Sequence, residues 1–279
     1  MGWILISWCL SLYLRLWEGR DPTATRLGDG LLVAAFLYLV AGAYCFTLPH
    51  TPLGNRSQSP YAFLSALGLL RKRNFAVLMT ISLLSTVLSP FFYNFSFLFL
   101  TDVRQIGLSP STANWVMSLG QVSEIVVLLG LASSLRRLGL KRILLLGVAA
   151  QGLRFAIFAV GRPTWLVAGS QALHGVVFAF FYVGLVVAVE HLSEREYRAS
   201  AQGLLTFTRS GVGALFGNFL AGQVYDHFAL PGGGHAWHWI FLVPTCVAIL
   251  GLTMFGLLFP EDRQTSTPNS AGTTEECVG

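Results

Sequence analysis

The sequence has few charged residues for its length. Charged side chains make up 11% of the 279 residues, whereas 54% of the residues are hydrophobic. A soluble domain carries about a quarter charged residues, because a wet surface must cover its core. The uncharged stretches are long enough to cross hydrocarbon, which takes about 20 residues per helix. The composition therefore excludes an ordinary soluble domain and indicates an integral membrane protein.

The sequence also lacks the motifs of common catalytic and metal sites. It has no glycine-rich phosphate loop, no nucleophile elbow and no zinc ligands at the usual spacing. Its four cysteines form no recognisable disulfide framework, since three of them lie inside apolar segments. His235 and His238 are too few to hold a metal ion. We therefore predict no enzyme, no ATP-driven pump, no metal site and no cofactor.

Glycine, proline and charged residues divide the apolar sequence into eight segments. They are residues 1–17, 30–48, 75–100, 112–135, 142–160, 164–190, 199–223 and 237–259. Only helices and closed barrels satisfy every backbone group in lipid, and barrel strands alternate over about ten residues. These segments are continuous, so the sequence predicts an all-α, multi-pass protein. The first segment lacks the basic start and cleavage site of a signal peptide, and we expect it to be retained.

Basic residues are distributed unequally between the two sides of the predicted membrane. One side receives eleven of them: Arg56, Arg71, Lys72, Arg73, Arg136, Arg137, Lys141, Arg142, Arg195, Arg198 and Arg263. The other side receives four: Arg20, Arg26, Arg104 and Arg162. Loops rich in basic residues face the cytoplasm. We therefore predict that the first side and the C-terminus are cytoplasmic, and we interpret the net charge of +5 as a signal of orientation rather than of nucleic-acid binding.

One acidic residue, Glu124, lies near the centre of a predicted span. A charge at that depth costs at least ~2.5–3.5 kcal/mol, so it normally faces a wet cavity or a partner. Gln121 lies three residues earlier and therefore on nearly the same helical face. One interpretation is a substrate-binding edge whose carboxyl group also carries a proton. The other is an ion pair that joins two helices, with Arg154 or Arg209 as the cation.

Five further residues within the spans are candidates for a site. Arg154 and Arg209 could each form a structural ion pair or contact substrate. His174 could relay protons, or it could be a packing histidine with a hydrogen-bond partner. Two segments are rich in aromatic residues, and Tyr93 and Phe178 are the residues in them that we expect to stack on a planar ligand.

The order of spans and several short motifs resemble a known family. Two spans, a basic central loop and six further spans resemble a major facilitator superfamily transporter without the first four of its twelve helices. More specific stretches resemble the nucleoside:proton symporter family within it. They are Leu48-Pro-His-Thr-Pro52, Ser118-Leu-Gly-Gln-Val-Ser-Glu124, Gly152-Leu-Arg154-Phe155, His174-Gly-Val-Val-Phe178 and Arg198-Ala-Ser-Ala-Gln202. The resemblance extends from residue 1 to about residue 259.

The resemblance implies a domain organisation. Residues 1–48 would be the last two helices of an N-terminal bundle, and residues 75–260 would form a complete C-terminal bundle of six helices. Residues 49–74 would be the cytoplasmic central loop, and residues 261–279 a disordered cytoplasmic tail. Because both bundles line the substrate site in this superfamily, we expect this chain to carry only part of that site.

The resemblance also implies binding residues. Gln121 and Glu124 match a glutamine and a glutamate of the family's eighth helix, and Phe178 matches an aromatic residue of its tenth. Tyr93 and Asn94 are approximate equivalents of a polar pair on the seventh helix. Ala179 stands where the family has an acidic residue, which is a departure.

The implied function is proton-coupled transport of a nucleoside or nucleoside-like solute across the cell (inner) membrane. The expected partners are that solute, the proton and the lipid bilayer, with no nucleic acid. One alternative is a permease for another small solute, which Ala179 favours. The other is a membrane sensor or receptor that keeps the same scaffold without transporting.

Overall fold

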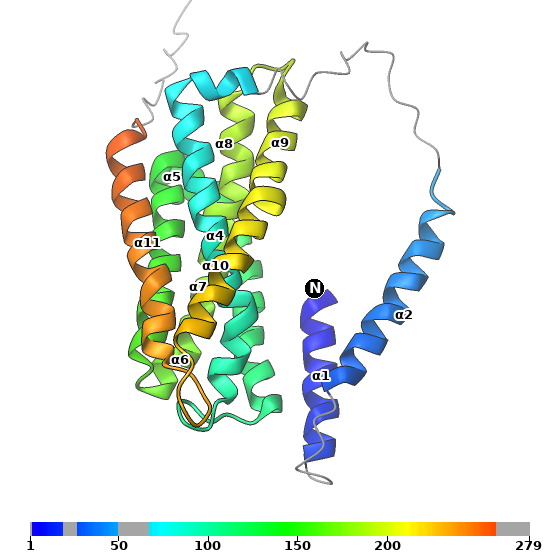
Figure 1. Cartoon of the computed structure of the whole chain (residues 1–279). Coiled ribbons are helices and arrows are strands. Elements are labelled where there is room, and N and C mark those ends of the chain that lie inside the picture. Colours follow the sequence, from blue (N-terminus) through cyan, green and yellow to red (C-terminus); the bar gives the residue numbers. More distant parts are fainter. Residues whose placement is uncertain (1, 19–26, 50–66, 261–279) are drawn as a thin grey trace, which may run out of the picture.

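A computed structural model describes residues 2–18, 27–49 and 67–260, and these residues form a helical protein (Figure 1). The helices are α1 (Gly2–Glu18), α2 (Leu27–Cys45), α4 (Arg73–Thr101), α5 (Pro110–Val160), α6 (Thr164–Gly169), α7 (Leu173–Val176), α8 (Gly184–Leu192), α9 (Arg198–Thr206), α10 (Ala214–His227) and α11 (Trp237–Leu258). The all-α prediction is confirmed. The predicted disordered tail, and residues 50–66 of the predicted central loop, lie outside the described residues.

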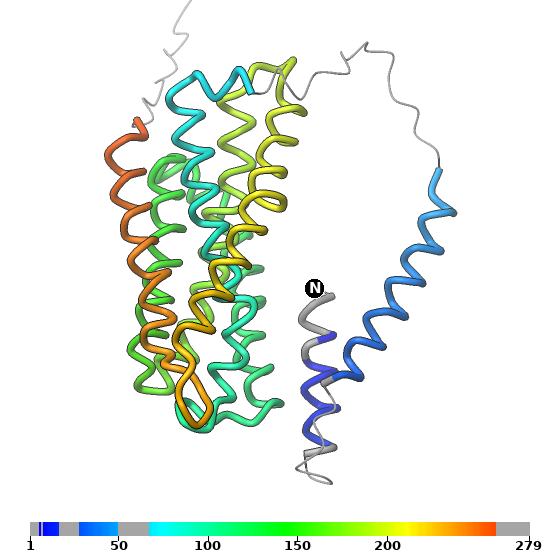
Figure 2. Tube along the Cα trace, in the orientation of Figure 1, coloured from blue at the N-terminus to red at the C-terminus, as the bar shows by residue number. Residues whose placement is uncertain are grey.

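The described parts of the eight predicted spans can be followed along the trace in Figure 2. Within the described ranges, five helical stretches are long and apolar enough to cross a membrane: residues 28–45, 73–101, 110–160, 164–192 and 237–258. The stretch 110–160 contains two of the predicted spans. The remaining two predicted spans correspond to α1 and to the α9–α10 segment.

Helix α5 reverses direction at a glycine. Gly139 has φ 78° and ψ 165°, a conformation that costs a residue with a side chain much more than it costs glycine. The helix starts with the expected chemistry, since Ser109 Oγ accepts a hydrogen bond from the Thr112 backbone N–H and Pro110 occupies the first turn. It ends at Gly161, which has φ 70°. The predicted break between residues 135 and 142 therefore lies at Gly139.

Two further spans are helical with wider turns at their centres. Residues 164–192 run through α6, α7 and α8, with a π-helical turn at Val177–Val183. The α9–α10 segment contains a similar π-helical turn at Phe207–Gly213. Such turns are rare and occur often at functional sites, because they change which side chains face the interior.

The bundle has an apolar cluster towards each end. One cluster includes Phe75, Leu78 and Phe255, and the other includes Phe99 and Phe241. Along α4, the buried hydroxyl side chains of Ser82, Ser85 and Thr86 occur between these clusters, and that of Ser96 lies beside the second. The middle of the bundle is thus the polar part of its interior.

The α9–α10 segment packs closely on α4 through small residues spaced by four. A Cβ atom on Gly213 would lie 3.0 Å from Cβ of Thr86, and one on Gly217 would lie 2.8 Å from the carbonyl oxygen of Val87. Ala221 is fully buried in the same line. Small residues at this spacing let two helices approach in a membrane.

Helices α1 and α2 form an antiparallel pair, and α1 also contacts α5. Trp8 Nε1 donates a hydrogen bond of 3.2 Å to Ser118 Oγ, and its ring centroid is 5.4 Å from that of Trp115. Many large apolar side chains on α2 are exposed, including Leu31 and Phe36. Such a surface suits lipid or other transmembrane helices rather than water.

Candidate functional site

Three of the predicted site residues meet in the middle of the bundle. His174 on α7 lies between the two halves of α5, which carry Glu124 and Arg154. Its Nε2 is 3.9 Å from Oε2 of Glu124, and its Nδ1 is 3.2 Å from Nη1 of Arg154. Arg154 is only 2% exposed. These contacts connect one carboxylate, one imidazole and one guanidinium group.

The partners of His174 determine where its proton lies. A guanidinium group only donates hydrogen bonds, so Nδ1 of His174 must accept from Arg154. In a neutral imidazole the other nitrogen then carries the proton, and this nitrogen faces Glu124. In this arrangement His174 is uncharged and presents its N–H group to a carboxylate.

Aromatic rings surround the two basic groups. The ring of Phe92 stacks on His174, with centroids 5.1 Å apart, and the Arg154 guanidinium lies 3.6 Å from the Phe92 centroid. Tyr93 meets His174 edge-on at 6.1 Å. Contact with a π face stabilises a guanidinium group that is removed from water.

Close approach of α5 and α7 depends on two glycines. A Cβ atom on Gly120 would lie 3.0 Å from the carbonyl oxygen of Gln171, and one on Gly175 would collide with the backbone of Ser123 and Glu124. Ser123 Oγ donates a 2.5 Å hydrogen bond to the carbonyl oxygen of Ala172. These contacts hold Glu124 and His174 in register.

Two amide side chains near this contact have unused hydrogen-bonding atoms. Among the described residues, Gln121 Oε1 has no hydrogen-bond partner, and neither does either polar atom of the Gln171 amide. Gln171 is fully buried. Buried polar atoms normally have partners, so these atoms are available to a polar ligand or to water.

The second arginine, Arg209, lies in the π-helical turn Phe207–Gly213, beside α4. The Arg209 guanidinium is 4.3 Å from the ring centroid of Tyr182, and the Tyr182 hydroxyl is hydrogen-bonded to Ser89 Oγ. Ser89 precedes Tyr93 by four residues, so both face the same side of α4. In the same region Ser85 Oγ is hydrogen-bonded to the Gln151 amide oxygen.

The other predicted residues lie at the edge of this region or outside it. Tyr93 is 58% exposed. Asn94 Nδ2 donates a 3.0 Å hydrogen bond to Oδ1 of Asn218 on α10. Phe178 is half-buried and packs against the apolar cluster that contains Phe75, and Ala179 is completely buried.

The structure adds residues that sequence reasoning missed. Phe92, Gln171, Ser89 and Tyr182 contact or adjoin the predicted groups. A signal for Gln171 existed, because it precedes His174 by three residues and therefore shares its helical face. For the others, the sequence contained no comparable spacing to a charged residue on the same helix.

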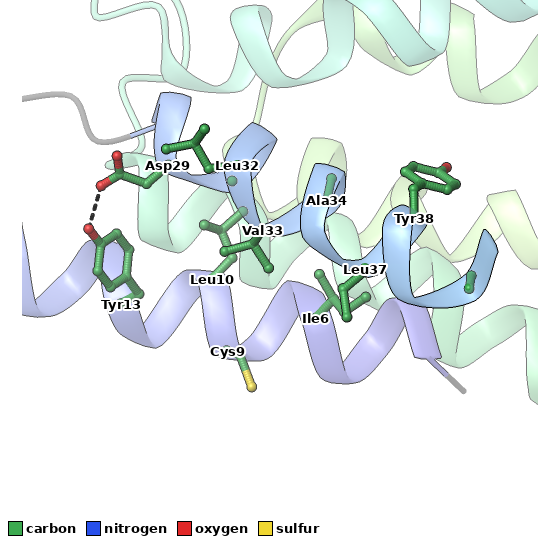
Figure 3. Close-up of a pocket in the computed structure, with 12 residues that line it drawn as sticks. Ile6, Cys9, Leu10, Tyr13, Asp29, Leu32, Val33, Ala34, Leu37 and Tyr38 are labelled. Carbon is green, nitrogen blue, oxygen red and sulfur yellow. Dashed lines mark hydrogen bonds between the residues drawn. The ribbon is translucent and has the colours of Figure 1, made fainter. Parts of the chain in front are cut away.

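An apolar cavity of 840 Å³ lies elsewhere, between α1 and α2 (Figure 3). At its wall the Tyr13 hydroxyl donates a 2.5 Å hydrogen bond to Asp29 Oδ2. None of the predicted site residues lines it. Its apolar walls suit a helix or a lipid chain better than a polar solute.

Comparison with known proteins identifies similar transporters. Residues 1–264 match the family described as Nucleoside H+ symporter. The putative nucleoside transporter YegT of Escherichia coli (strain K12) is 32% identical over 250 residues, covering 86% of this chain and 57% of the relative. The nucleoside permease NupG of the same organism is 28% identical over 256 residues, covering 87% and 59%.

A solved structure shares the fold. The crystal structure of the nucleoside transporter NupG, as an Asp-to-Ala mutant, matches with a TM-score of 0.76 and 27% sequence identity. The match covers 92% of this chain and 65% of that chain. The chain therefore spans less than two thirds of the length of the relatives and of the structure that it resembles.

Proposed function

This chain belongs to the nucleoside H+ symporter family, and we propose on that basis that it takes part in proton-coupled transport of a nucleoside or nucleoside-like solute. It is a multi-pass membrane protein. The observation that carries the proposal is the contact of His174 with both Glu124 and Arg154 in the middle of the bundle. Titratable groups at that depth are expensive and normally line a substrate or proton pathway.

The groups around this contact suit a nucleoside. A nucleoside offers a planar base, ring edges that donate and accept hydrogen bonds, and ribose hydroxyl groups. Gln121 and Glu124 would bind polar edges, and Tyr93 would pack against the base. Phe178 and Asn94 would act at the margin of the site, with Phe178 on the apolar side.

Glu124 and His174 would provide the proton site. A carboxylate that faces an imidazole N–H can gain a proton from one side of the membrane and lose it to the other. Arg154 would fix the orientation of His174 through the hydrogen bond to its Nδ1. Arg209, in the turn Phe207–Gly213, would contribute a second positive charge. Transport would require both bundles to change orientation around this site.

We also propose a topology. Residues 1–48 would belong to the first bundle and residues 75–260 would form the second. The 49–74 connection, the turn at Gly139 and the C-terminus would face the cytoplasm of a cell whose inner membrane holds the protein. The excess of basic residues on that side supports this orientation.

A permease for a different small solute is the second candidate function. The buried Ala179 favours it, because this chain lacks an acidic group that the nucleoside family carries at the matching position. A solute that needs no second carboxylate would then be preferred over a nucleoside.

Uptake of tritiated uridine into cells without their own nucleoside permeases tests the proposal. Cells that express this chain within a full-length transporter, with both bundles present, should accumulate uridine, and a protonophore should abolish the accumulation. Cells that express the Glu124→Gln variant at equal membrane abundance serve as the matched control. Uptake no greater than in cells without the chain, at verified membrane abundance, would contradict the proposal, and uptake of another solute alone would favour the second candidate.

A further inference from the structure

The described middle of the bundle contains more positive than negative charge. Arg154 and Arg209 are guanidinium groups and remain charged. Glu124 supplies one negative charge, and His174 is neutral because its Nδ1 accepts from Arg154. A cation removed from water without a counter-charge is costly, so an anion is attracted to such a place.

The two arginines are related through one turn of α4. Arg154 lies on the ring of Phe92, and Arg209 lies on the ring of Tyr182, whose hydroxyl meets Ser89. Ser89 and Phe92 are three residues apart, which corresponds to about 4.5 Å along a helix. Tyr93, on the same turn, contacts His174 edge-on, and the other ring nitrogen of His174 faces Glu124. We call Arg154, Arg209, Ser89, Phe92 and Tyr93 the arginine strip.

Both arginines have unused hydrogen-bond donors. Among the described residues, the Nε atoms of Arg154 and Arg209 are buried and lack a hydrogen-bond partner. Arg154 is almost completely buried, so water does not replace that partner freely. A guanidinium group forms its strongest hydrogen bonds with an anionic oxygen or nitrogen.

From this geometry we propose that the arginine strip selects nucleosides whose base ring is negatively charged over neutral nucleosides of the same size. The inference rests on the proposed function, because it assigns a substrate class to the same site. The ionised edge of the base would approach the two guanidinium groups, and the planar base would lie beside Tyr93. A neutral base would leave the excess positive charge without compensation.

Three kinds of anion could accept hydrogen bonds from the two guanidinium groups: an ionised base ring, inorganic phosphate and a lipid headgroup. A phosphate group would also accept from guanidinium, but it gains nothing from the neighbouring aromatic rings. Competition by free phosphate therefore separates an ionised nucleoside from a general anion site.

The test is binding to the purified full chain in lipid nanodiscs, measured by titration calorimetry in mildly alkaline buffer. Xanthosine, whose base is ionised there, is compared with guanosine, whose base remains neutral. We expect xanthosine to bind at least about tenfold more tightly, because charge-assisted hydrogen bonds are about twice as strong as neutral ones. Arg209→Gln should remove this preference, because it should weaken xanthosine binding more than guanosine binding. Arg209→Lys keeps the charge and should retain part of the preference.

Two controls define the outcome. Arg162→Gln changes an exposed arginine outside the spans and should leave both affinities unchanged. Size-exclusion profiles of each variant show whether it is folded. Equal affinity for the two nucleosides overturns this inference, and so does a preference that survives Arg209→Gln. In either case, binding of guanosine to the chain still supports the proposed function. If neither nucleoside binds, the proposed function fails as well. Binding of phosphate through Arg209, with no preference for xanthosine, overturns the assignment of a nucleoside ring.

Discussion

Glu124 and His174 face each other across the contact between α5 and α7, with Oε2 of Glu124 3.9 Å from Nε2 of His174. Arg154 donates to the other ring nitrogen from the second half of α5. A proton added to Glu124 weakens its attraction for the Nε2–H group, and a proton added to Nδ1 removes the acceptor of Arg154. Either protonation therefore disrupts one of two contacts that join the halves of α5 through α7. This relation would couple proton binding to helix packing.

Replacement of Gln121 tests the binding edge of the site. Gln121→Ala removes an amide whose Oε1 has no partner among the described residues. Nucleoside binding should weaken by about 0.5–1.5 kcal/mol for one lost hydrogen bond. Titration calorimetry measures the change, and Val126→Ala, a truncation on the exposed face of the same helix, should leave the affinity unchanged. Unaltered affinity in Gln121→Ala would exclude a direct contact with the ligand.

Replacement of Gly175 tests the helix contact that holds the site. Gly175→Ala places a methyl group against the backbone of Ser123 and Glu124, and should destabilise the protein by about 1–3 kcal/mol. Gly222→Ala is the matched control, because no atom lies within 4 Å of the added Cβ. Thermal unfolding of both variants in detergent compares them. Equal stability of the two variants would mean that α5 and α7 are farther apart than described.

Labelling of single cysteines tests the topology. After replacement of the native cysteines, Leu138→Cys next to the turn at Gly139 should resist an impermeant maleimide in intact cells. Val103→Cys follows α4 on the opposite side and should be labelled readily, since Val103 is 88% exposed. Permeabilised cells should label at both positions. Rapid labelling of Leu138→Cys in intact cells, with Val103→Cys protected, would reverse the orientation.

The ion pair between Lys72 and Glu194 predicts that pH affects the stability of the protein. Lys72 Nζ donates a 2.8 Å hydrogen bond to Glu194 Oε1, and this bond with the nearby charge lowers the pKa of Glu194. A lowered carboxyl pKa contributes stability above the unfolded pKa, and that contribution is lost as pH falls through the folded pKa. Both groups are exposed, so the effect on stability should be small. Lys72→Met should raise the pKa of Glu194 in an NMR titration, and an unchanged pKa would mean that the pair does not form in solution.

The sequence was sufficient for the helical architecture because hydrophobic length is the dominant constraint in a membrane. Each predicted span corresponds to one helix, to half of α5 or to a run of consecutive helical segments. The predicted start of the second span, residue 30, differs from the observed Leu27 by three residues. Charge and glycine patterns also located the reversal in α5, because lipid-exposed turns inside hydrocarbon are excluded.

The internal arrangement of the site was less accessible. The sequence identified Glu124, His174 and Arg154 separately, but it did not show that His174 contacts both of the others. Such contacts depend on the rotation of each helix about its axis, which close packing at Gly120 and Gly175 sets. Pairing of Arg209 with Tyr182 depends in the same way on the turn at Phe207–Gly213. These contacts join different helices, and the spacing of residues within one helix does not predict them.

Substitution of Glu124 by glutamine is the most direct test of a proton site in this bundle. Glu124→Gln removes the titratable group but keeps the shape of the side chain and an oxygen that can face Nε2 of His174. Proton-driven accumulation of uridine should be lost in cells that express the variant, whereas exchange of labelled for unlabelled uridine continues and membrane abundance is normal. Unchanged accumulation at normal abundance would contradict the role of Glu124 in proton coupling. Loss of the protein from the membrane would instead show that the carboxylate serves the packing of α5 against α7.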